Sequence, residues 1–114
     1  MEHKQLKILL IDGRLQRPNS FKELPKEIGE LKRLEQLYVA FCELSSLPES
    51  IANLKQLKVL DLSGNAFEIF PVSVCSLKQL QWLDMGYNKI NELPAAFGDL
   101  INLVELSLKG NELE

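Results

Sequence analysis

The sequence predicts a solenoid, a stack of copies of one small structural unit, because a single pattern recurs every 23 residues. Leucine or phenylalanine followed by proline occurs at 24–25, 47–48, 70–71 and 93–94. Another set of positions, each five residues after a leucine, has the same spacing and holds Cys42, Asn65, Asn88 and Asn111. Such regular self-similarity is the signature of stacked repeats rather than of a globule with a unique interior.

The length and composition predict one soluble domain without an electrostatic signal for nucleic acid. The chain has 114 residues, 46% of them hydrophobic, and a net charge of -3 from 13 basic and 16 scattered acidic residues. No apolar run approaches the roughly 18 residues that span a bilayer. The N-terminus has mixed charge rather than the pattern of a signal peptide. We therefore expect a cytoplasmic location, no membrane insertion, no nucleic-acid partner and no cofactor.

Each unit is expected to begin with a short strand and a sharp bend. In the segment 57–79, Leu60 and Leu62 alternate with polar residues, which is the period of a strand with one apolar face. Asn65 follows at the bend. Its amide can both donate hydrogen bonds to buried backbone groups and accept them, so that these groups are not left unpaired.

The second half of each unit is expected to return along the opposite side. Pro71 fixes the backbone and suits the first turn of a short helix or 3₁₀ segment. Val74, Leu77 and Leu80 then recur every three residues and should point inward. One unit cannot bury this much apolar surface alone, whereas stacked neighbours can.

We interpret residues 1–114 as a single domain built from five units. The first unit is irregular, with Arg14 in the asparagine position and an inserted turn at 17–20. The predicted units are 6–33, 34–56, 57–79, 80–102 and the partial unit 103–114. A helical bundle is the competing interpretation of the apolar spacing at 28–37. The regular prolines and the Leu-x-Leu segments argue against it.

The repeated residues resemble the leucine-rich repeat family, specifically the 23-residue type with Leu-Pro-x-x-Ile units, known from bacterial and intracellular proteins. The resemblance covers residues 6–113. It implies an α/β fold, a right-handed solenoid with a parallel β-sheet on the concave face and short helices or 3₁₀ turns on the convex face. It also implies binding of other macromolecules through the concave face.

The variable strand positions should face outward on this concave surface in columns, so that residues of adjacent strands such as Val59 and Trp82 are neighbours. One column would hold Ile8, Gln36, Val59, Trp82 and Glu105, and the next Leu10, Tyr38, Asp61, Asp84 and Ser107. Aromatic residues occupy several of these outward positions. They are Tyr38, Phe41, Trp82 and Tyr87. Aromatic side chains on a rigid, solvent-facing sheet are typical of binding hot spots. They could instead cover exposed sheet backbone, because aromatic residues favour strands. We predict that they bind a partner.

Two carboxylates, Asp61 and Asp84, should be neighbours on adjacent strands of the same face. Because like charges side by side repel, a basic group of a partner could relieve them. Splayed, solvated carboxylates are the alternative. A calcium site would need about six to eight oxygen ligands, and few others are evident. We therefore predict no metal site.

Catalysis has little support in the sequence. His3 is the sole histidine and precedes the first predicted strand. Cys42 should be a buried thiol in the asparagine position, and Cys75 has no histidine nearby in the pattern to activate it. Phosphate-binding, zinc and Ser-His-Asp motifs are not found. We expect no enzymatic activity and no catalytic residues.

The predicted function is a non-catalytic interaction module that binds a protein or peptide on its concave face. The partner-binding residues would be Tyr38, Phe41, Asp61, Trp82, Asp84 and Tyr87. The alternative is a structural or scaffold segment that self-associates through its uncapped ends, since solenoids need polar caps. In that case a homo-oligomer would form through the C-terminal edge, at Leu106, Leu108 and Leu113.

Overall fold

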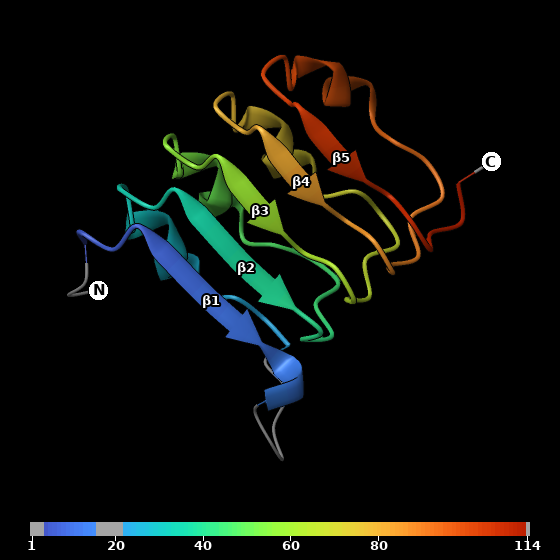
Figure 1. Cartoon of the computed structure of the whole chain (residues 1–114), viewed down its shortest axis with the longest axis horizontal. Coiled ribbons are helices and arrows are strands. Elements are labelled where there is room, and N and C mark those ends of the chain that lie inside the picture. The colour runs from blue at the N-terminus through green and yellow to red at the C-terminus, as the bar shows by residue number, and fades with distance from the viewer. Residues whose placement is uncertain (1–3, 16–21, 114) are drawn as a thin grey trace.

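Five short parallel strands form one sheet in chain order (Figure 1). The computed structural model describes residues 4–15 and 22–113. The predicted inserted turn at 17–20 lies outside these residues. The strands are β1 (Ile8–Asp12), β2 (Gln36–Ala40), β3 (Val59–Asp61), β4 (Trp82–Asp84) and β5 (Glu105–Ser107). Each strand pairs in parallel with the next one along the chain, so every connection crosses over to the adjacent strand.

The register of the sheet follows the sequence period. Residues 23 apart are partners from β2 to β5, as in the pairing of Val59 with Trp82 (82 − 59 = 23). Ile8 of β1 pairs with Gln36, 28 residues further on (36 − 8 = 28), because the first connection is five residues longer. The strand spacing therefore agrees with the period, while the exact unit boundaries stay a prediction.

Short 3₁₀ segments alternate with the strands. They are η1 (Gly13–Leu15), η2 (Lys26–Glu30), η3 (Glu49–Asn53), η4 (Val72–Ser76) and η5 (Ala95–Asp99). Each of η2 to η5 follows a proline whose φ lies between −65° and −72°. A leucine ends each of these four segments, and its N–H donates to a carbonyl three residues earlier. The prolines fix the backbone as predicted, but each lies immediately before its 3₁₀ segment, with extended backbone, rather than in the first turn.

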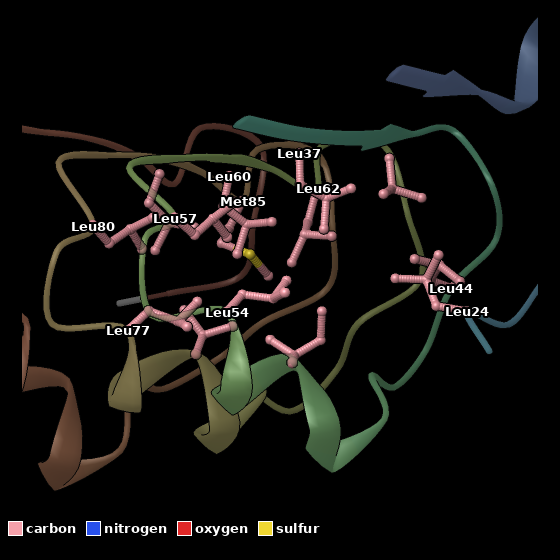
Figure 2. Close-up of a cluster of buried hydrophobic side chains, with 14 of the residues drawn as sticks. Leu24, Leu37, Leu44, Leu54, Leu57, Leu60, Leu62, Leu77, Leu80 and Met85 are labelled. Atoms are coloured by element: carbon pink, nitrogen blue, oxygen red, sulfur yellow. The ribbon is translucent and has the colours of Figure 1, made fainter. Parts of the chain in front are cut away.

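Leucine side chains fill the space between the sheet and the 3₁₀ segments (Figure 2). Leu60 and Leu62 are fully buried, and the residues on either side of Leu60 are only half-buried, as the strand period predicts. Val74, Leu77 and Leu80 are buried as well, so the return segment points inward as expected. The sheet with alternating 3₁₀ turns confirms the predicted α/β solenoid.

Asn65 shows how consecutive repeats are joined. Its Oδ1 accepts hydrogen bonds from the backbone N–H groups of Cys42 and Leu44, each at 3.0 Å. Its Nδ2 donates to the carbonyls of Val39 and Leu62, at 2.8 and 2.9 Å. The amide therefore pairs backbone groups of its own repeat and of the preceding one, which confirms the predicted role of this position.

The two cysteines are both free thiols and both buried. Cys42 occupies the asparagine position, and its Sγ lies 3.3 Å from the carbonyl oxygen of Ala40. Cys75 belongs to η4. Burial raises the pKa of each thiol, because a thiolate would lose its hydration there. Burial of this kind disfavours the reactive thiolate form of both residues.

Candidate functional site

The strand residues that alternate with the buried leucines form a continuous outer surface, which we call the sheet face. Strand pairing aligns them in two columns. The first column contains Ile8, Gln36, Val59, Trp82 and Glu105, and the second contains Leu10, Tyr38, Asp61, Asp84 and Ser107. The columns are those expected from the sequence.

The two aromatic strand residues of the sheet face make polar contacts on the face itself. Trp82 is half-buried, and its Nε1 donates a 2.8 Å hydrogen bond to Oε2 of Glu105 on the next strand. The hydroxyl of Tyr38 donates to Oε1 of Gln36, also at 2.8 Å. These bonds hold both rings in fixed orientations without burying them, so less conformational entropy remains to be lost on binding.

Asp61 and Asp84 lie side by side, as predicted, and each also has a structural role. The Oδ1 of Asp61 accepts a 2.9 Å hydrogen bond from the backbone N–H of Ser63. The Oδ1 of Asp84 accepts one of 2.8 Å from the N–H of Gly86. Each carboxylate therefore stabilises the bend after its own strand. Within residues 4–15 and 22–113, no cluster of three potential metal ligands occurs.

Phe41 and Tyr87 lie just beyond the strands, at bends with left-handed backbone. Their φ angles are 56° and 57°, although neither is glycine. In both cases the ring packs over a glycine of the next repeat: Phe41 over Gly64, and Tyr87 over Gly110. A Cβ atom at either glycine would collide with the ring. The two rings therefore pack on the backbone as well as lining the surface.

Phe41 has a second neighbour, which Tyr87 lacks in the described part of the chain. The guanidinium carbon of Arg14 lies 4.1 Å from the centroid of the Phe41 ring, a cation–π distance. Asp12 holds Arg14 in place, accepting from Nη2 at 2.7 Å and from Nε at 3.0 Å. This hydrogen bonding to Arg14 lowers the pKa of Asp12 below its ordinary value.

Two residues that the sequence reasoning placed in the outward columns, but did not select, are prominent on the sheet face. Ile8 and Leu10 of β1 are 54% and 72% exposed. Leu10 pairs with Tyr38, so an apolar region begins at β1. The opposite end is acidic, with Asp61, Asp84 and Glu105 on β3 to β5. The presence of aliphatic residues at outward positions of the sequence could have identified this apolar region.

The predicted C-terminal edge is only partly as expected. Leu106 and Leu113 are 38% and 36% exposed. Leu108 is instead partly buried against the core, because it continues the inward side of its strand. Ile101 and Val104, which the prediction did not include, are the most exposed apolar residues of this region, at 79% and 81%.

A parallel sheet with 3₁₀ returns and an asparagine ladder defines the class of leucine-rich solenoids. The model of the leucine-rich repeat family matches residues 32–90 and 67–113, and the chain belongs to this family. Proteins of this family are commonly interaction modules and are typically not catalytic.

A solved structure of a leucine-rich repeat protein from Leptospira interrogans is similar to the chain. The two share 40% sequence identity with a TM-score of 0.87, over 96% of this chain and 27% of that protein. The chain thus spans about a quarter of the length of that relative. No curated protein matches the sequence. Among the described residues, none of the helices has the length and apolar character needed to cross a bilayer.

Proposed function

We propose that the chain is a non-catalytic interaction module that binds a protein or peptide through the sheet face, the concave side in this family. The observation that carries the proposal is the juxtaposition of exposed apolar residues with carboxylates on adjacent strands. Leu10, Tyr38 and Asp61 are successive members of one column. Exposed apolar surface on a rigid sheet, bordered by polar groups, is characteristic of binding sites.

The sheet face favours a small contact. Five strands at about 4.8 Å spacing span ~19 Å, and four exposed positions along each add ~14 Å. The resulting area of a few hundred Å² is below the roughly 800 Å² that each partner buries in a standard protein interface. A peptide segment fits this area. Its apolar side chains would contact β1 and β2, and its basic groups would lie near Asp61 and Asp84.

Replacing Trp82 and Tyr87 together with alanine tests the proposal. We expect loss of partner capture in a pull-down and loss of binding of the isolated partner in calorimetry. The midpoint of thermal unfolding should change little, since Tyr87 is 54% exposed, Trp82 is half-buried, and neither belongs to the buried core. Replacing the exposed Val104 with alanine is the control and should preserve binding. A collapse of unfolding stability in the double variant would show that the rings are structural.

A scaffold role through self-association is the second candidate, favoured by the apolar region around β5. Within the described residues β5 pairs only with β4, and Leu106 and Leu113 are partly exposed near its free edge. An open strand edge can pair with another chain. Sedimentation at micromolar concentration tests this function: a dimer that Leu106→Ser dissociates supports it, and a monomer contradicts it.

A further inference from the structure

A second surface breaks the repeat, on the side where the chain runs from β3 to η4. Ile69 and Val72 are 80% and 58% exposed there. The residues 23 positions from Ile69 are Ser46 and Glu92, both polar. The exposed aliphatic pair is therefore specific to this repeat and is not required by the leucine-rich framework.

Hollows flank this aliphatic pair on both sides. The larger, of about 400 Å³, lies toward the preceding repeat, where Ser45 and Ser46 are too small to fill it. The smaller, of about 120 Å³, lies toward the following repeat, beside Pro94. Small ligand sites in proteins have volumes of roughly 300–1,000 Å³, so the larger hollow can accept one or two side chains.

The floor shared by the two hollows is rigid. Phe70 lines both of them and is itself only 2% exposed. Its ring meets Phe97 edge to face, with centroids 5.6 Å apart and an angle of 85° between the planes. A packed aromatic pair of this geometry fixes the shape of the floor before any ligand arrives.

The charge around the hollows has one sign. Glu49 lines the larger hollow, Glu68 and Glu92 line the smaller one, and neither lining includes a lysine or arginine. In the described part of the chain, none of these three carboxylates forms an ion pair. The surface thus presents exposed aliphatic groups bordered by uncompensated negative charge.

We propose that the surface around Ile69, Val72 and the two hollows, which we call the lateral surface, is a second binding site. It takes a peptide segment with an apolar side chain flanked by lysine or arginine. The apolar side chain enters the larger hollow against Ile69 and Phe70. The basic groups meet Glu49 on one side and Glu68 and Glu92 on the other. Because these residues lie outside the strands, this site and the sheet face can be occupied at the same time.

Selection from a displayed library of random short peptides, with the whole chain as bait, tests the site. Ile69→Ser is the key variant, since serine stands at the equivalent position in the preceding repeat. Ile101→Ser is its matched control, because Ile101 is 79% exposed and lies elsewhere. Trp82→Ala separates the lateral site from the sheet face. Affinities of the selected peptides are measured by fluorescence anisotropy.

Enriched peptides whose binding survives Trp82→Ala are assigned to the lateral surface, and we expect them to combine an aliphatic or aromatic residue with basic neighbours. Ile69→Ser should weaken their binding about tenfold, the effect of losing one well-buried aliphatic contact. Ile101→Ser and Trp82→Ala should leave their affinity unchanged, and replacing Glu49, Glu68 and Glu92 with glutamine should reduce its dependence on salt. The proposal is overturned if no basic apolar peptide is enriched, or if Ile69→Ser binds such peptides as tightly as the wild-type chain.

Discussion

Two bends of this solenoid, at Phe41 and at Tyr87, share one backbone conformation but differ in what surrounds them. Both residues have φ near 57°, and both rings lie over a glycine of the following repeat. The Phe41 ring is also covered by Arg14, and its side chain is 37% exposed. Tyr87 has no such cover among the described residues and is 54% exposed. The same position of the repeat therefore holds a covered ring at Phe41 and a more exposed ring at Tyr87.

The inward neighbours of these two rings differ as well. Cys42 follows Phe41, and Asn88 follows Tyr87. The amide of Asn88 accepts from the N–H of Phe67 at 3.1 Å and donates to the carbonyl of Leu62 at 3.0 Å. The Cys42 thiol has no amide and meets backbone groups of Ala40 and Gly13 instead. The more exposed ring therefore lies above the bend with more side-chain hydrogen bonds.

Converting the Tyr87 bend to the Phe41 type should have the largest effect on stability. Asn88→Cys removes the amide and leaves buried backbone groups, including the N–H of Phe67, without partners. Such losses cost about 2–4 kcal/mol of unfolding free energy. Denaturant unfolding measures the change. Asn111→Cys, at a partly buried equivalent, should cost less, and equal costs would show that burial does not set the effect.

Disturbing the glycine beneath Phe41 should have an intermediate effect. Gly64→Ala places a methyl group against the ring at a residue with φ of 68°. The strain and the displaced ring should cost about 1–2 kcal/mol in denaturant unfolding. Gly98→Ala is the control, because a Cβ there meets no atom within 4 Å. If Gly64→Ala and Gly98→Ala had the same stability, the packing of the Phe41 ring would not require a glycine at position 64.

Removing the cover of Phe41 should have the smallest effect, and that effect should depend on pH. Arg14→Ala should shift the NMR resonances of Phe41 and leave those of Tyr87 unchanged. The pKa of Asp12 is lowered by Arg14 in the folded chain, so its stabilising contribution is present above its ordinary value of 3.8. It is lost as pH falls through the lower folded pKa.

Acid titration of both proteins checks this dependence. The difference in unfolding midpoint between the wild-type chain and Arg14→Ala should be constant near neutral pH and should shrink as the pH falls below 3.8. A difference that grew toward acid pH would contradict the assignment of the shift to this contact.

The sequence was sufficient for the framework, because the period specifies which side chains share an environment. The inward leucines, the hydrogen-bonding role of Asn65 and the neighbours Val59–Trp82 and Asp61–Asp84 were all predicted correctly. A parallel sheet in strict register converts a spacing of 23 residues directly into contact between strands. Binding by the six predicted residues stays a prediction.

The details of the surface could not be predicted in this way. The cover of Phe41 depends on the rotamer of Arg14, which lies in the irregular first unit, and the left-handed backbone at Phe41 is uncommon for a residue with a side chain. The hollows beside Ile69 arise from small residues in a neighbouring repeat. Comparing equivalent positions outside the strands, as well as within them, would have revealed that aliphatic pair.

Three bonds of Asn65 cross between repeats, and they reach back 21, 23 and 26 positions to the repeat immediately before its own. A duplicated segment of 23 residues, placed between two neighbouring repeats, preserves every one of these offsets. An insertion of another length within these units shifts the offsets, whereas the longer first connection, with an offset of 28 between Ile8 and Gln36, precedes the ladder of amides. Within the regular units the ladder therefore lets the solenoid lengthen or shorten by whole repeats, so a family built on it can vary the area of its sheet in discrete steps.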